Sequence, residues 1–541
     1  MDLIFYNGDI ITIDSNNPAA RAVAVKGEKI AAVGGDREII SLRNSRTEVI
    51  DLAGRTLLPG FNDSHMHLFG YALNLARVDL SPCTSVEQVI DSIRNFIREQ
   101  SVVPGEWVLG WGWDQSLFSD NRVPDRHDLD RASSEHCITL MRTCCHICLV
   151  NTMALKQAGI FENPPEVNGG AIPVDDQGKP TGVLEEKAMQ LVTGFIPALD
   201  RKMLKSLIME AGRRFLATGL TSVQTDDLMA LGEERLPDLI GAYRELEAEG
   251  ELPVRINLQL LLPTVERLQE FLDCGYRTGQ GGSMFKIGPL KLLTDGSIGG
   301  RTALLSSPYA DKPDSSGVAV LAPEEQALLV DIGCGAGMQI AAHAIGDAAI
   351  DTILTIYEEA QKRHHRQDPR FRVIHASVIR PDLFSRFKAL NAIADIQPSF
   401  VPSDESLVGR HLGPERAAWT YRWKDLLNHG IRVGCGSDCP VETYKPLFTV
   451  QAAVTRQNQN GRPPGGWFPD QKLSLGEALH IYTAGSAYCS YEEDIKGSIT
   501  AGRLADLVVL SGNIKMVEPA EIKDLDIDFT VVGGKIAFRR K

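Results

Sequence analysis

The sequence predicts an α/β protein built on a (β/α)₈ barrel of the TIM type, with a composite β-sandwich made from both ends of the chain. Three observations support this fold class. Eight short apolar runs alternate with helical patterns, β-rich segments occupy both ends, and one unusually long connection separates the first two apolar runs. Alternating strands and helices favour a parallel sheet, and eight such units in a row favour its closure into a barrel.

Both ends of the chain are rich in short β-type runs that end in glycine turns. The N-terminal end contains DLIFYNGDIITID and EVIDLAGRTLLPG, and the C-terminal end contains GSITAGRLADLVVLSG and DIDFTVVGGKIAFRR. Such runs, bounded by Asn-Gly, Ala-Gly and Gly-Gly, are typical of strands joined by tight turns. We therefore expect residues 1–57 and 490–541 to form one composite β-sandwich, with residues 58–489 as the barrel domain between them.

The middle of the chain alternates apolar strands with helical patterns such as RKMLKSLIMEAGRRFLATG. A doubly wound sheet is the alternative to a barrel, but no G-x-G-x-x-G opens a helix after the first strand. The expected strands are RTLLPGFNDSH, GLTSVQTDD, RINLQLLL, FKIGPLKLLTDG, QIAAHAIGD, RVIHASV, ADIQPSF and RVGCGSD.

One connection is far longer than a turn between a strand and a helix. Residues from about 81 to 205 separate the first two barrel strands and contain WVLGWGWD, CITLMRTCCHICLVN and a segment rich in glycine and proline. Long connections in compact domains usually carry structure of their own. We interpret this one as an inserted α/β subdomain that covers the mouth of the barrel.

Composition narrows the class of protein. The chain has 541 residues, of which 43% are hydrophobic and 23% charged, and a net charge of −14. An acidic chain without basic clusters is a poor candidate for binding nucleic acid or an anionic membrane, and no apolar stretch reaches the length of a membrane span. The N-terminus lacks the basic region of a secretory signal, and the ten cysteines are scattered, so we expect free thiols in the cytoplasm.

Metal-type side chains fall at the ends of several predicted strands. In PGFNDSHMH, His65 and His67 alternate and so point to the same side of a strand. His343, His375 and Asp438 close the fifth, sixth and eighth strands. Because the carboxyl ends of barrel strands meet at one opening, these side chains should converge. Each residue has a structural alternative, such as a core imidazole or a helix cap. Metal-type residues at four strand ends together favour a site for one or two divalent metals, and zinc is the metal we expect before any other.

Lys291 lies in the apolar run of the predicted fourth strand. Burial disfavours a charged amine, and a neutral amine can react with CO₂ to form a carbamate able to bridge two metals. An ion pair with Asp295 is the alternative role, and Lys286 is the competing lysine.

At these motifs the sequence resembles the amidohydrolase superfamily. The likeness is carried by PGFNDSHMH, PLKLLTDGSIGGRTA, AAHAIGD, VIHA and GCGSDCPVE. The order of WVLGWGWDQ, DLDRASSEHCITLMRTCCH, GKPTGVLEE, LTSVQ and ITAGRLADLVVL is similar to the branch that contains the YtcJ-like proteins and N-substituted formamide deformylase. The resemblance implies a barrel with a composite β-sandwich and hydrolysis of a carbon–nitrogen bond other than a peptide bond. It also implies that His65, His67 and Asp438 bind one metal, and that carboxylated Lys291 bridges to a second held by His343 and His375.

We expect metal-activated water to attack the carbonyl group of the substrate. Asp438 would accept a proton from that water and return it to the leaving amine. For each of four further residues, the sequence allows either a role in substrate binding or a structural role. His146 could polarise the carbonyl or pack, and Arg301 could bind a substrate anion or an internal carboxylate. Trp111 and Trp113 could line an apolar pocket or belong to a core.

Alternatives remain for the reaction and for one motif. The same site could serve a lactone, ester or phosphoester hydrolase or an isomerase, whereas a non-catalytic scaffold should lack the metal ligands. H-E-x-x-H, G-x-S-x-G and the P-loop motif do not occur. Cys144, Cys145, His146 and Cys148 suggest a zinc knuckle without a second half. The expected partner is a small-molecule substrate, and a homo-oligomer stays an option.

Overall fold

The fold is described from a computed structural model that covers residues 1–541 and describes all of them except 120–121, 145 and 198. The chain forms two compact units. One comprises Met1–Gly70 and Ile208–Lys541, and the other comprises Tyr71–Leu207.

The first unit contains the predicted barrel of eight parallel strands. Each strand pairs in parallel with the next one along the sheet. The strands are β8 (Phe61–Met66), β15 (Leu220–Asp226), β16 (Arg255–Leu261), β17 (Phe285–Leu293), β18 (Ile340–Ala344), β19 (Arg372–His375), β20 (Ile393–Ile396) and β21 (Arg432–Cys435). The predicted fold class is therefore confirmed, and the strands follow the chain in order.

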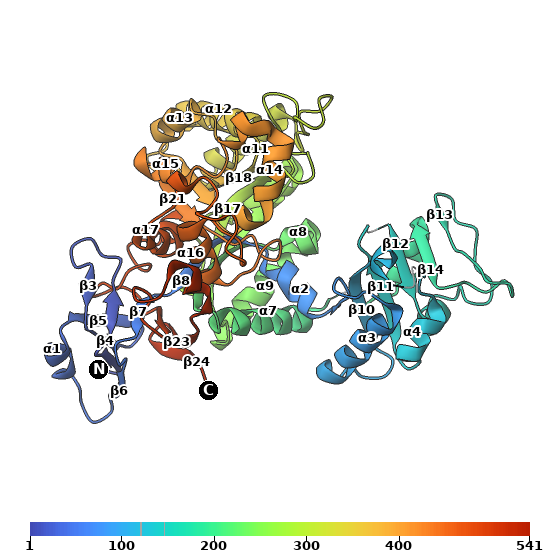
Figure 1. The fold of residues 1–541 in the computed structure, drawn as a ribbon, viewed down its shortest axis with the longest axis horizontal. Coiled ribbons are helices and arrows are strands. Elements are labelled where there is room, and N and C mark those ends of the chain that lie inside the picture. The colour runs from blue at the N-terminus through green and yellow to red at the C-terminus, as the bar shows by residue number, and fades with distance from the viewer. Residues whose placement is uncertain (120–121, 145, 198) are drawn as a thin grey trace. The chain divides into compact units, whose positions relative to one another are not determined.

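Helices connect these strands and lie outside the barrel (Figure 1). They are α8 (Leu228–Leu231), α9 (Leu236–Glu249), α10 (Val265–Asp273), α11 (Pro323–Gly335), α12 (Asp347–His364), α13 (Leu383–Leu390), α14 (Phe400–Ala417) and α15 (Trp423–Asn428). After the last barrel strand come α16 (Pro446–Thr455), α17 (Leu475–His480) and α18 (Ser486–Cys489).

The first and last barrel strands are joined at their carboxyl ends. The Asp438 amide donates to the His65 carbonyl at 2.8 Å, and the His67 amide donates to the Cys439 carbonyl at 2.7 Å. Buried Asp63 accepts from the Ser437 amide at 3.1 Å. These bonds bring the metal-type residues of the first and last strands into one neighbourhood.

The predicted first strand, RTLLPGFNDSH, breaks into two strands at Gly60. Its first half is β7 (Thr56–Pro59), which pairs in the β-sandwich, and its second half is β8 in the barrel. A Cβ at Gly60 would lie 2.3 Å from Thr221, so only glycine allows the chain to pass from one sheet to the other here. The expectation of one continuous strand was wrong because the strand breaks at Gly60, where the Thr221 side chain lies against the glycine, and the apolar pattern contains no sign of that contact.

The β-sandwich consists of two sheets. One contains β1 (Leu3–Tyr6), β4 (Ala22–Lys26), β5 (Lys29–Gly34) and β6 (Glu48–Asp51), flanked by α1 (Asp36–Ile40). The other contains β2 (Asp9–Ile11), β3 (Ala19–Ala20), β7, β22 (Leu507–Leu510), β23 (Ile527–Val532) and β24 (Lys535–Arg539).

Side chains from both ends of the chain fill one sandwich core. Phe5 and Val23 from the N-terminal part share it with Leu507, Val509 and Val531 from the C-terminal part. Figure 1 shows both termini beside these sheets. The sandwich is therefore composite, whereas the exact boundaries at residues 57 and 490 stay a prediction.

The second unit is an α/β structure with a mixed six-stranded sheet. Its strands are β9 (Val78–Asp79), β10 (Trp107–Trp113), β11 (Cys137–Arg142), β12 (Ile147–Val150), β13 (Gly170–Ala171) and β14 (Val183–Glu186). Its helices are α3 (Val86–Gln100), α4 (Arg126–Ala132), α5 (Thr152–Gln157) and α6 (Gln190–Thr193), while α2 (Leu68–Leu75) and α7 (Arg201–Leu216) run across its two boundaries.

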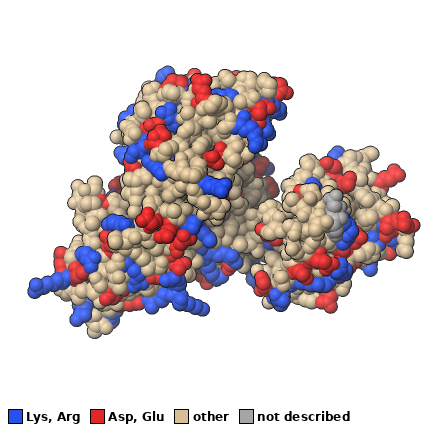
Figure 2. All heavy atoms as spheres, viewed as in Figure 1, with Lys and Arg blue, Asp and Glu red and all other residues tan. Residues whose placement is uncertain are grey.

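Two further features are the distribution of charge on one face of the molecule and the character of its described helices. On the face seen in Figure 2, acidic and basic side chains are interspersed. Within the described residues, none of the helices combines the length and the apolar character needed to span a bilayer.

Candidate metal centre

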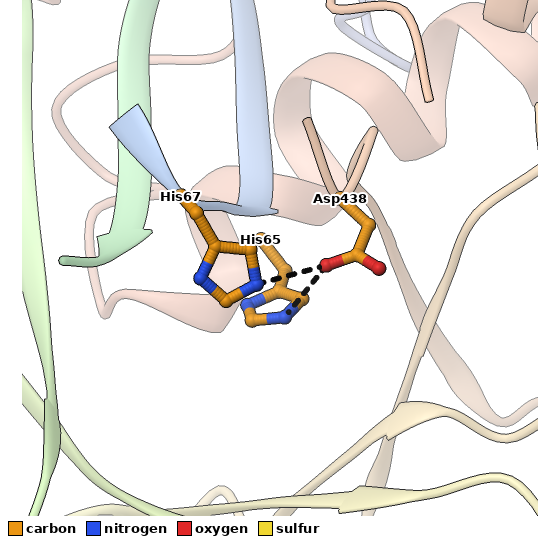
Figure 3. A group of neighbouring side chains, drawn as sticks. All are labelled: His65, His67 and Asp438. Atoms are coloured by element: carbon orange, nitrogen blue, oxygen red, sulfur yellow. Dashed lines mark hydrogen bonds and ion pairs between the residues drawn. The ribbon is translucent and has the colours of Figure 1, made fainter. Parts of the chain in front are cut away.

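Three metal-type side chains converge where β8 and β21 end. The Nε2 atoms of His65 and His67 lie 3.3 Å and 3.2 Å from Asp438 Oδ1. Figure 3 shows the two imidazole rings facing the same carboxylate oxygen. One possible ligand atom from each residue lies within 4.8 Å of the others, which is the only such group of three found in the described part of the chain. His65 lies in β8 and His67 directly follows its last residue, so alternation along the extended chain places both histidines on one side.

Two further imidazoles continue this cluster. The ring centroids of His375 and His65 lie 5.7 Å apart, and those of His375 and His343 lie 4.5 Å apart. His375 ends β19, and His343 lies in β18. His375 has φ 74° and Asp438 has φ 58°, a left-handed backbone conformation that costs non-glycine residues about 1–3 kcal/mol and is concentrated at functional sites.

Glutamine side chains hold two of the four imidazole rings. Gln259 donates its amide to the Ser64 carbonyl at 2.9 Å, so its oxygen must be the atom 2.9 Å from His65 Nδ1. Gln397 likewise donates to the Asp395 carbonyl and turns its oxygen to His375 Nδ1 at 2.8 Å. An amide oxygen can only accept, so each Nδ1 carries the proton and each Nε2 keeps a free lone pair.

Oxygen atoms flank the other two rings as well. His67 Nδ1 donates to the Asp226 carbonyl at 2.7 Å. His343 Nδ1 lies 3.0 Å from Asp295 Oδ1, although out of line for a hydrogen bond. Metal-binding histidines are usually oriented in this manner through the nitrogen that does not bind the metal.

The electrostatics of the cluster fit a bound cation. Burial lowers the pKa of His65 and of His375, which favours the neutral imidazole that binds metals. Burial also lowers the pKa of His67, but the adjacent Asp438 carboxylate more than reverses this effect and raises it to about 9. The Nε2 atoms and the carboxylate oxygen are all acceptors when unprotonated, so their close approach is stabilised by a proton on His67 or by a metal cation in its place. The donor set therefore fits a divalent metal.

Lys291 belongs to the same cavity. Its side chain is buried at 2% exposure, and burial lowers the pKa of its amine. The Asp295 carboxylate accepts instead from the amides of Ile345 and Gly346, at 3.0 Å and 2.8 Å. Lys286 forms an ion pair with Glu492 at 2.7 Å and does not line the cavity.

A cavity of about 560 Å³ opens over the cluster. His65, His67, Lys291, His343, His375 and Asp438 all line it. The six residues predicted to hold metal are thus brought together in one place. Further carboxylates in its walls come from Asp404 and Glu442.

The structure places Arg301 in an ion pair with another side chain of the protein. Its guanidinium donates to Asp311 at 2.8 Å through Nη2, and Nε contacts the same carboxylate. Asp311 also accepts from His411 at 2.8 Å. This is the internal-carboxylate role that the sequence left open, and Arg301 does not line the cavity.

The other predicted substrate-binding residues lie in the second unit. Trp113 is buried in its core and donates to the Leu140 carbonyl at 3.1 Å, whereas Trp111 is 37% exposed. His146 is exposed and pairs with Glu186 at 3.2 Å, and the hydrogen bond from this pair raises its pKa.

The zinc-knuckle segment shows no metal group among its described residues. Cys144 is exposed and Cys148 is buried, while Cys145 lies outside the described residues. All cysteines that the structure describes are free thiols.

Sequence reasoning missed the residues that orient the imidazoles. Gln259 follows Leu258 within β16, and Gln397 follows Ile396, the last residue of β20. A polar side chain in the carboxyl-terminal half of a buried strand, or directly after it, was the available signal.

Comparisons with known proteins agree over almost the whole chain. Residues 48–538 match the Amidohydrolase family. The chain is 33% identical over 541 residues to YtcJ of Bacillus subtilis, covering 100% of both chains. It is 28% identical over 563 residues to N-substituted formamide deformylase of Arthrobacter pascens, covering 100% of this chain and 98% of the relative. Its fold is similar to that of an uncharacterized metal-dependent hydrolase from Pyrococcus furiosus, with a TM-score of 0.76, 30% identity, and coverage of 96% and 99%.

Proposed function

The chain belongs to the Amidohydrolase family, and from that premise we propose that it is a metal-dependent hydrolase that cleaves a non-peptide carbon–nitrogen bond of a small molecule. One observation carries the proposal. The lone pairs of His65, His67 and Asp438 converge within 4.8 Å at the end of the barrel strands, beside a cavity large enough for a small molecule.

We assign His65, His67 and Asp438 to one divalent metal, and His343, His375 and carboxylated Lys291 to a second. Imidazole and carboxylate donors suit zinc. Such a metal, when bound, lowers the pKa of water towards neutrality and polarises a carbonyl oxygen.

The protein itself supplies the proton transfers. Asp438 lies close to both His65 and His67 and lines the cavity, so its carboxylate is placed to accept a proton from water. The same group then returns that proton to the leaving nitrogen. Gln259 and Gln397 keep the imidazole rings in one orientation during this exchange.

The substrate class follows from the relatives. One relative is named for deformylating N-substituted formamides, so N-formyl and N-acyl amines are the first substrates to test. The scattered free thiols favour a reducing compartment, and we place the enzyme in the cytoplasm.

A panel assay on metal-loaded protein tests the proposal. We expect turnover of one or more N-formyl or N-acyl amines, and loss of that turnover together with metal in His65→Ala. Hydrolysis of only lactones, esters or phosphotriesters would contradict cleavage of a carbon–nitrogen bond. Turnover that persists in metal-free His65→Ala would contradict the metal centre itself.

A further inference from the structure

We propose that the cavity beside the metal centre contains a subsite for an organic cation, formed by Asp404 and Glu442. The proposal rests on the proposed function of this same cavity. It narrows the substrate to an N-acyl compound that carries a second, positively charged group such as an ammonium or a guanidinium.

The two carboxylates come from separate elements of the barrel unit. Asp404 lies in the first part of α14, and Glu442 lies in the loop after β21, four residues beyond Asp438. The Ser403 hydroxyl donates to Glu442, and the Tyr421 hydroxyl donates to Asp404. Both donors are neutral, so they orient the carboxylates without balancing their charge.

His411 lowers the pKa of Asp404 but is itself paired with Asp311, and the described part of the cavity wall offers these carboxylates no paired lysine or arginine. Among the described residues that line it, Lys291 is the only lysine or arginine, and it belongs to the metal cluster. Arg301 follows the loop that contributes Ser297 to the cavity, but its charge is taken up by Asp311. Both carboxylates are half-buried, and a carboxylate partly removed from water without a counter-charge is costly, so a ligand cation would find two favourable partners here.

The response of these groups to burial supports the same conclusion. Burial raises the pKa of Asp404 and of Glu442, and the charges of Asp404 and Asp438 raise the pKa of Glu442 further. A carboxylate whose pKa is raised by burial and by neighbouring negative charge is stabilised by a cation beside it.

Apolar side chains form much of the remaining wall. Met229, Leu293, Ile298, Phe400 and Val441 line the same cavity. A ligand suited to it has a hydrophobic body with a cationic end, and its amide group reaches the histidines. An anionic substrate would be repelled by the same two carboxylates.

Equilibrium binding to the metal-loaded full chain tests the subsite without requiring turnover. The probes are benzyltrimethylammonium, benzyl alcohol and benzylsulfonate, which share one ring and differ in charge. We expect the ammonium to bind most tightly and the sulfonate most weakly. Glu442→Gln should weaken ammonium binding by about tenfold, between the effect of an exposed ion pair and that of a fully buried one. Glu442→Lys should reverse the order of the ammonium and the sulfonate.

Glu415→Gln is the matched control, because Glu415 is exposed, lies on α14 and changes the net charge equally. It should leave all three affinities unchanged. Equal affinity of wild type for the three probes, or equal effects of Glu442→Gln and Glu415→Gln, would overturn the subsite.

Turnover of N-formylbenzylamines with aminomethyl, ethyl or carboxymethyl groups in the para position separates this proposal from the proposed function. Charge-selective binding without turnover of any of them would support the subsite and contradict the hydrolase. Turnover without preference for the aminomethyl compound would support the hydrolase and overturn the subsite.

Discussion

Replacing Gln259 by leucine should separate metal binding from ordinary stability. Gln259 is fully buried, donates to the Ser64 carbonyl at 2.9 Å and accepts from His65 Nδ1 at 2.9 Å. Leucine has a similar size but cannot form either hydrogen bond. The Ser64 carbonyl would keep its hydrogen bond from Arg372 at 2.6 Å, so only the His65 N–H would lose its partner.

The structure therefore sets the size of two effects. One buried donor left without a partner costs about 1–3 kcal/mol of unfolding free energy. Without its acceptor, the His65 ring is free to change tautomer and orientation, so the dissociation constant of the metal should rise by about 10–100-fold. Gln259→Glu keeps an acceptor for His65 and should retain most of the metal affinity.

Gln339→Leu is the control for this experiment. Gln339 is buried in the same barrel and donates to the carbonyls of Arg370 and Cys489 at 2.9 Å, and its side chain forms no hydrogen bond with the four clustered histidines, all of which the structure describes. Metal affinity is measured by competition with a chelator, and stability by urea unfolding of the metal-free variants. Our reasoning is refuted if Gln259→Leu binds metal as tightly as wild type, or if Gln339→Leu weakens metal binding equally.

Two more variants test other parts of the account. Asp438→Asn cannot accept a proton and should lower kcat by roughly 10²-fold or more, while its metal content falls much less than that of His65→Ala; unchanged turnover would exclude Asp438 as the base. Glu492→Gln should lower the unfolding free energy by about 3–5 kcal/mol near neutral pH, because it leaves Lys286 and Lys496 without their counter-charge. The two lysines overcome the effect of burial and lower the pKa of Glu492 to about 2, so its stabilising effect is full above the unfolded pKa and is lost as pH falls through the folded value. Urea unfolding near pH 7 and near pH 3 should show a smaller difference from wild type at the lower pH, and an equal difference would contradict the ion-pair explanation.

The barrel could be predicted because its strands are short apolar runs separated by amphipathic helices. Such periodicity is a local property of the chain, so it can be recognised in the sequence without knowledge of tertiary contacts. The convergence of His65, His343, His375 and Asp438 followed from the same topology, since the strand ends of a parallel barrel meet at one opening.

The residues that depend on contact between distant segments were not predictable in this way. Gly60 divides the first strand because Thr221 approaches it closely, and Thr221 is far away in the sequence. Gln259 of β16 orients His65 of β8, two strands away in the sheet, and Gln397 after β20 orients His375 of the adjacent β19, which only the arrangement of the sheet can show. Asp404 and Glu442 become neighbours through the packing of a helix against a loop, for which periodicity contains no signal.

Metal content is the most direct test of the central claim, that the clustered histidines and Asp438 hold a divalent metal. The measurement is elemental analysis of the purified full chain after growth with added zinc or manganese, beside His65→Ala prepared in parallel. The account predicts one to two metal ions per wild-type chain and a clear loss in the variant. A wild-type content well under one ion per chain, or equal contents in both proteins, would contradict it.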